Sequence, residues 1–90
     1  MSRIPVDESV EDLNRARQSL IEELQAMMWY DQRIKETEDE ELRSVLAHNR
    51  DDEKEHASLI LEWIRRHDRA MDRELREILF SAKKLSEMGD

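Results

Sequence analysis

The sequence contains no cysteine, one glycine, one proline and only 4% aromatic residues. The lack of cysteine excludes a disulfide framework and any thiolate metal site. Strands are rich in β-branched and aromatic residues, and turns depend on glycine and proline, so this composition predicts an all-α protein. A chain of 90 residues is large enough for one small domain.

Basic residues are also in the minority. The 15 lysines and arginines are outnumbered by 23 aspartates and glutamates, which gives a net charge of −8. This excess of negative charge argues against nucleic acids and anionic membranes as partners, because both attract basic surfaces, and it favours cations as ligands. No apolar run is long enough to span a membrane and no signal peptide is recognisable, so we expect a cytoplasmic protein without a membrane partner.

Apolar residues recur at helical spacing along three stretches. We expect a first helix at about residues 7–35, a second at about 38–67 and a third at about 70–86. Thr37 followed three residues later by Glu40 predicts a capping box at the start of the second helix. The third stretch either continues the second helix or forms a separate one, since no glycine or proline lies between them.

The two long stretches each carry one apolar stripe. The first stripe consists of Val10, Leu13, Leu20, Leu24, Met27 and Ile34, and the second is a 4-3 repeat of Leu42, Leu46, Asn49, Glu53, His56, Ile60, Trp63 and His67. Two such helices, each about 40 Å long, form an antiparallel hairpin when a tight turn joins them. A lone hairpin leaves one side of each stripe exposed, so we expect two copies to pair into a ferritin-like four-helix bundle.

Folding the chain at a turn near Glu38 places residues whose numbers add up to about 76 at the same height. Glu23 and Glu53 meet this condition, and His56 lies one helical turn beyond Glu53 on the same face. Pairing of two hairpins then brings together one glutamate from each of two helices and one Glu-x-x-His from each of the other two. This is the ligand set of di-iron and di-manganese bundles, and it suits iron, manganese or zinc.

Other interpretations of these polar residues remain open. Buried polar residues in a helical seam often set the pairing register instead of binding metal, which is the interpretation we favour for Asn49 and His67. Tyr30 lies about 10 Å from Glu23 along the same face. It is either an outer metal ligand or redox neighbour, or a core tyrosine bonded through its hydroxyl. Glu22 could lead metal toward the site or be a solvated carboxylate, and Trp29 lies above it on a neighbouring stripe.

The pair Arg65-Arg66 is interpreted as a solvated face or as a partner of the dipole at the helix end. If the buried polar residues set only the pairing register, the protein is a helical scaffold or adaptor, and this is the alternative to a metal enzyme.

The sequence resembles the encapsulated ferritins, small ferritin-like proteins carried inside encapsulin shells. The similar stretches are residues 22–24, 29–33, 46–51, 53–57 and 61–63, and the region that they span covers about half of the chain. The resemblance implies a two-helix hairpin with a short third helix. It also implies a ferroxidase that oxidises Fe(II) to Fe(III) at a di-iron site shared across a homodimer, in a ring-shaped homodecamer of five dimers.

Carried onto this chain, the resemblance implies Glu23, Glu53 and His56 as iron ligands, with Tyr30 beside them as a further catalytic residue. Glu22 matches the first member of an acidic pair on the approach to the site. Gln25 stands where the second carboxylate would be, so the approach site differs here. The family also implies iron storage within an encapsulin nanocompartment in the cytoplasm and a C-terminal shell-docking peptide. Residues 86–90 do not resemble one, so we expect that it has been removed or that targeting lies elsewhere.

Overall fold

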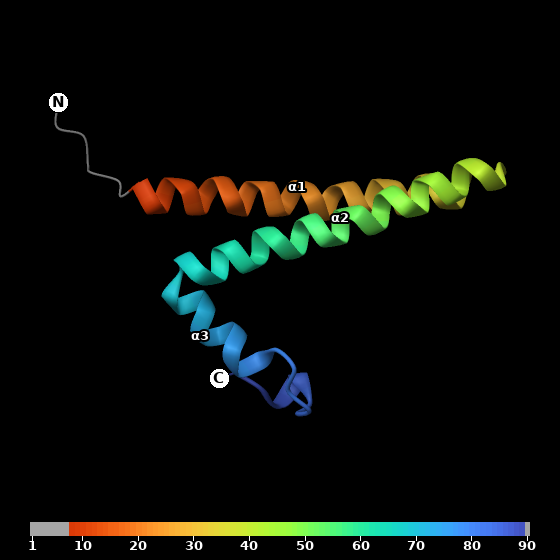
Figure 1. Ribbon diagram of the computed structural model, residues 1–90. Helices are drawn as coiled ribbons and strands as arrows, with labels where there is room; N and C mark the ends of the chain where they lie inside the picture. Colours follow the sequence, from red (N-terminus) through yellow and green to blue (C-terminus); the bar gives the residue numbers. More distant parts are fainter. Residues whose placement is uncertain (1–7, 90) are drawn as a thin grey trace.

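The computed structural model describes residues 8–89, and in this range it consists of helices without a strand. The elements are α1 (Glu8–Glu36), α2 (Glu40–His67), α3 (Arg69–Ile78) and a short 3-10 helix, η1 (Leu85–Glu87). Figure 1 shows α1 and α2 side by side in opposite directions, with α3 turning away from them at the far end of α2. The predicted all-α hairpin with a short additional helix is therefore confirmed for the described residues.

A three-residue turn joins α1 to α2. The Asp39 carboxylate caps α2 by accepting a hydrogen bond from the Leu42 backbone amide at 2.8 Å, and the Thr37 hydroxyl accepts one from the Asp39 amide at 3.2 Å. The predicted capping box of Thr37 and Glu40 is therefore wrong, because the N-cap is Asp39 and its side chain satisfies one of the free amides of the first turn, that of Leu42. Arg43 closes the turn by donating to the Thr37 carbonyl oxygen.

The contact between α1 and α2 is narrow. Among the described residues the buried hydrophobic side chains are Leu13, Ala57 and Ile64. Ala57 and Ile64 were not in the predicted seam of α2, whose members Leu42, His56 and His67 are exposed instead. The reason is geometric: in a hairpin each helix turns only one edge of its apolar stripe toward the other helix, and the remaining edge faces outward.

The molecule is consequently flat, with extents of 55 × 45 × 18 Å. The smallest extent is less than two helix diameters of about 10–12 Å each, so the hairpin has two broad uncovered faces. Large apolar side chains are exposed on both long helices: Ile21, Leu24 and Met28 on α1, and Leu42, Val45 and Leu59 on α2. None of the helices among residues 8–89 is both long enough and apolar enough to cross a membrane.

The region predicted as a helix at residues 70–86 divides into two parts. A single extended residue, Asp68, separates α2 from α3, so α3 is a separate helix and not a continuation. α3 ends at Ile78, because Leu79 is extended and Phe80 adopts a left-handed backbone conformation with φ of 61°. Neither conformation can continue a right-handed helix. Leu85, expected at the end of that helix, lies in η1 with 76% of its surface exposed.

Candidate metal centre

Glu23 on α1 and Glu53 and His56 on α2 converge at mid-length of the hairpin. Each offers one donor atom, and these three atoms lie within 4.8 Å of one another. The turn at residues 37–39 explains the convergence, because antiparallel packing about Glu38 brings Glu23 and Glu53 to the same height. His56 follows Glu53 by three residues, which places both side chains on one face of α2.

The distances in this cluster suit a metal ion. The His56 Nδ1 atom lies 3.4 Å from Glu53 Oε2 and 3.8 Å from Glu23 Oε2. Two donor atoms bound to one ion at about 2.1 Å each are separated by at most about 4.2 Å. The imidazole and either carboxylate can therefore share one ion with little movement, and Nδ1 is the nitrogen that faces it.

The charge of the cluster also fits a cation. Among the described residues, His56 is the one ion-pair partner of Glu23 and Glu53, and neither carboxylate faces a lysine or an arginine. The glutamate side chains are 26% and 20% exposed, and the imidazole is 52% exposed. Partly desolvated carboxylates without a fixed positive partner are destabilised, so the cluster attracts a cation from solution.

One chain supplies only part of a coordination shell. Three donor groups leave several positions open on a metal such as iron, and the half-exposed imidazole lies on an uncovered face of the hairpin. The arrangement therefore leaves room for further ligands on that face.

The residues predicted as accessory ligands lie outside this group. Glu22 is exposed and accepts a hydrogen bond from Gln18 Nε2 at 3.3 Å. Trp29 is half-exposed and lines a shallow hollow of about 330 Å³ together with residues Gln32, Arg33 and Glu36. Gln25 is exposed. The roles of Glu22 and Trp29 in metal uptake remain predictions.

Tyr30 is half-buried on α1, and the guanidinium carbon of Arg33 lies 5.9 Å from the centre of its ring. This contact holds the aromatic ring by a cation–π interaction. Its predicted role beside the metal is not tested by this contact.

His67 and the Arg65-Arg66 pair differ in how they are held. The His67 ring stacks on Trp63 at 4.0 Å, and its Nδ1 lies 2.7 Å from the Trp63 carbonyl oxygen, so it is engaged by its own helix. Arg66 is 68% exposed, as predicted for a solvated face, whereas the Arg65 side chain is only 24% exposed and pairs with Glu62 and Asp72. The sequence reasoning missed Arg65 because its partner Asp72 lies beyond the Asp68 break, whose direction no spacing rule fixes.

A helical hairpin with two carboxylates and an imidazole on one face is the structural unit from which ferritin-like metal sites are built. The model of the EncFtn-like family matches residues 2–82, and the chain therefore belongs to this family, the encapsulated ferritins.

Individual relatives agree with this assignment. The chain is 48% identical over 79 residues to a "Ferritin-like protein" of Thermotoga maritima, a match covering 88% of this chain and 69% of that protein. It is 53% identical over 68 residues to an "Encapsulated ferritin-like protein" of Rhodospirillum rubrum, covering 76% of this chain and 49% of that protein. The matched stretch thus spans about half of the Rhodospirillum protein.

The fold recurs in a Nitrosomonas europaea protein of known crystal structure. That protein is 46% identical, with a TM-score of 0.84, over 94% of this chain and 97% of its own. At this identity the likeness supports a shared arrangement of the helices.

Proposed function

We propose that this protein is a ferroxidase, which oxidises Fe(II) to Fe(III) at a di-iron site formed when two chains pair across the face that carries Glu23, Glu53 and His56. The observation that carries the proposal is the convergence of these three donors, without a basic partner, on an uncovered face of the hairpin. Membership of the ferritin-like family supports iron as the metal, and manganese or zinc are substitutes that the same donors suit.

Charge balance supports the stoichiometry. With neutral imidazoles, two chains bring four carboxylate charges to the shared face, and two Fe(II) ions bring four positive charges. When bound, each Fe(II) gives one electron to dioxygen. The glutamates bind the more highly charged Fe(III) product more strongly than Fe(II), which makes the loss of the electron more favourable. The Nδ1 atom of His56 would hold the ion together with Glu23 and Glu53, and the second chain would supply the further ligands.

The exposed apolar side chains support pairing on both faces. Val45 and Leu59 lie at helical spacing from His56, so they flank the metal face, whereas Ile21, Leu24 and Met28 form a separate strip on α1. Both strips need cover, and two different two-fold contacts on opposite faces generate a closed ring where their geometry closes. This fits the homodimers and the ring of five dimers that the family resemblance implies.

We further propose that iron storage takes place in an encapsulin compartment in the cytoplasm. The name of the Rhodospirillum relative describes that protein as encapsulated. A flat hairpin 18 Å thick does not enclose a cavity, so a mineral formed here needs a surrounding shell to stay in solution. The encapsulin shell protein is accordingly the proposed partner besides further copies of this chain.

Oxygen consumption on addition of Fe(II) tests the proposal. We expect the wild-type protein to consume oxygen, and Glu53→Ala to lower the rate by at least about 100-fold, because it removes a ligand. Glu55→Ala is the matched control: Glu55 is an exposed glutamate on the same helix, outside the donor group, and its removal should leave the rate unchanged.

Sedimentation with and without Fe(II) tests the shared site separately. Because each chain holds half of the ligands, metal should shift the protein toward the dimer by mass action. A metal-independent dimer that consumes no oxygen would favour the alternative, a scaffold whose polar seam sets pairing only.

A further inference from the structure

The helix α3 has little support of its own. It is 10 residues long, and none of its residues is buried. Isolated helices shorter than about 12–15 residues are marginal in water, and most helical stability in proteins comes from packing an apolar face. Leu75 and Ile78 are only partly covered, so polar contacts must contribute to keeping α3 folded and to fixing its direction.

The start of α3 is held by Asp68. The Asp68 carboxylate caps α3 by accepting a hydrogen bond from the Met71 amide at 3.1 Å, and it also accepts one from Arg17 of α1 at 3.1 Å. These two bonds, the cap first, hold the pKa of Asp68 below its usual range. One residue thus joins the end of the hairpin to the first turn of α3.

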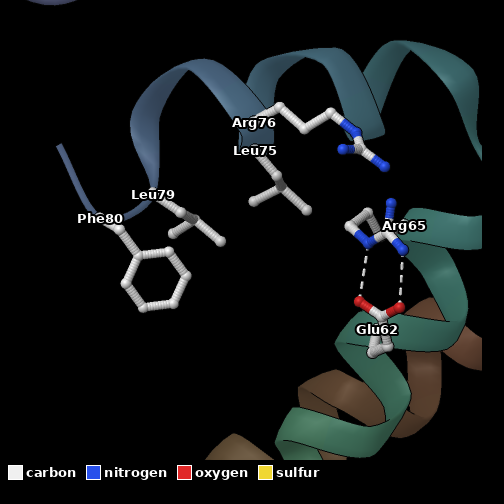
Figure 2. A pocket seen from close by; sticks show the side chains of 6 residues that line it. All are labelled: Glu62, Arg65, Leu75, Arg76, Leu79 and Phe80. Carbon is white, nitrogen blue, oxygen red and sulfur yellow. Dashed lines mark hydrogen bonds and ion pairs between the residues drawn. The ribbon is translucent and has the colours of Figure 1, made fainter.

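Arg65 joins the body of α3 to α2. Its guanidinium binds both oxygens of Glu62, at 2.7 and 2.8 Å, as Figure 2 shows, and its remaining terminal nitrogen donates to Asp72 of α3. A guanidinium that binds one carboxylate through two nitrogens is held in a fixed plane, so the third bond is directional. Arg65 is therefore positioned to hold Asp72 at one place relative to α2.

Two further bonds extend this contact into a network of alternating charges. Arg66 donates to Glu62 at 2.6 Å within α2, and Arg76 donates to Asp72 at 2.9 Å within α3. The hydrogen bonds of Arg65 and Arg66 lower the pKa of Glu62 to about 2, and that of Arg65 is the main cause of the lowered pKa of Asp72. Within this network of ion pairs, only the bond between Arg65 and Asp72 crosses from α2 to α3.

We propose that Arg65 is an electrostatic latch that keeps α3 folded and sets its direction relative to the hairpin, so that α3 is an arm whose folding depends on this charge contact. The latch also shapes the hollow of about 400 Å³ between α2 and α3, where Leu75, Leu79 and the fully exposed Phe80 lie opposite Glu62 and Arg65. Loss of the bond between Arg65 and Asp72 would abolish this hollow. The inference does not depend on the proposed ferroxidase.

Hydrogen exchange of the full-length protein, read by mass spectrometry for peptides from each helix, tests the latch. Arg65→Gln should raise the exchange rate of the α3 amides at least about tenfold while α1 and α2 stay protected, because the short helix loses its tie and unfolds locally. Arg66→Gln is the matched control. Arg66 binds the same glutamate from the neighbouring position but makes no bond to α3, so its loss should change α3 exchange by less than about twofold.

Salt and protein concentration complete the test. Raising the ionic strength from about 0.1 M to about 1 M shortens the screening length from about 10 Å to about 3 Å, and it should speed α3 exchange in the wild type more than in Arg65→Gln. The proposal is overturned if Arg65→Gln leaves α3 protected, or if Arg66→Gln exposes it equally. It is also overturned if the protection of α3 in the wild type depends on protein concentration alone, since neighbouring chains would then hold the helix.

Discussion

Two clusters on α2 share one spacing and differ chiefly in the residue that lies between the carboxylates. Glu53 and His56 are three residues apart, as are Glu62 and Arg65 nine residues further along the helix. Each pair meets a third carboxylate from another helix, Glu23 of α1 in the first cluster and Asp72 of α3 in the second. The two sites are thus the same arrangement, with an imidazole in one and a guanidinium in the other.

On the proposed assignment, one side chain decides whether such a cluster binds a metal or forms a closed set of ion pairs. At the junction of α2 and α3, here called the elbow, Arg65 supplies a permanent positive charge and pairs with both Glu62 and Asp72. The bonds to Glu62 lower the pKa of Glu62 to about 2. At mid-hairpin, His56 lies 3.4 and 3.8 Å from the carboxylates and offers a lone pair when it is neutral. The cluster of Glu23, Glu53 and His56 therefore needs a cation from solution, whereas the cluster of Glu62, Arg65 and Asp72 contains its own cation.

Exchanging the deciding residue at mid-hairpin gives the largest expected effect. His56→Arg should lower the rate of Fe(II) oxidation at least about 100-fold, since it replaces a ligand by a fixed cation that pairs with Glu23 and Glu53. The same variant should melt at a higher temperature than the metal-free wild type, because the carboxylates gain a partner. Oxygen uptake and thermal melting in the presence of a chelator measure the two effects. Retained oxidation would contradict the assignment of His56 as a ligand.

Metal addition should distinguish the clusters in the unaltered protein. Zn²⁺, which is not oxidised, should stabilise the folded chain by about 2.7 kcal/mol at about 100 times its Kd, as any ligand of the folded state does. The rise in melting temperature should disappear in His56→Ala and persist in Arg65→Gln. Calorimetric melting with and without chelator checks this, and an equal rise in His56→Ala would place the metal elsewhere.

The converse exchange at the elbow should give a smaller effect. Arg65→His places an imidazole three residues after Glu62 and opposite Asp72, so the elbow should gain a weak site for Zn²⁺ or Co²⁺. In a His56→Ala background, which silences the mid-hairpin site, titration calorimetry should then detect up to one additional ion per chain. Absence of binding would mean that the α3 carboxylate needs the longer arginine to stay in reach.

The smallest of the expected effects is the loss of the elbow contacts in acid. The pKa of Glu62 is lowered in the folded chain, so its contribution to stability is complete above its ordinary pKa of 4.5 and is lost as the pH falls through about 2. Asp72 and Asp68, which hold α3 directly, also have pKa values below their usual range, so we expect the α3 amides to stay protected at neutral pH and to lose protection as these carboxylates are protonated in acid. In Arg65→Gln, whose α3 amides should already exchange fast, the corrected rate should change little over the same pH range. Hydrogen exchange over a pH series, corrected for the intrinsic rates, measures the difference.

The hairpin and its central cluster follow from periodicities that the sequence displays directly. The stripes on α1 and α2 indicate two long helices, and the antiparallel turn fixes which residues share a height, so the convergence of Glu23, Glu53 and His56 could be predicted. That these three residues bind metal, with Tyr30 beside them, stays a prediction. The family resemblance, which the match over residues 2–82 confirms, was visible in motifs on the same two helices.

The elbow could not be predicted in this way. The helix is interrupted at Asp68, whose φ of −135° and ψ of 102° break it without a nearby glycine or proline that would predict the break. The end of α3 depends equally on Phe80, a residue type that seldom adopts a positive φ. Single-residue backbone choices of this kind are decided by tertiary contacts, here the ion pairs of Arg17 and Arg65.

The proposed division of the ligands between two chains has a consequence for mixed populations. On the proposed pairing, a chain with a damaged Glu53 or His56 disables the shared site of any intact chain that it joins. If half of the chains are damaged and pairing is random, about a quarter of the dimers keep two intact halves, because each two-fold site draws on both subunits. A defective copy would therefore behave as a dominant inhibitor, removing more activity than its share of the protein.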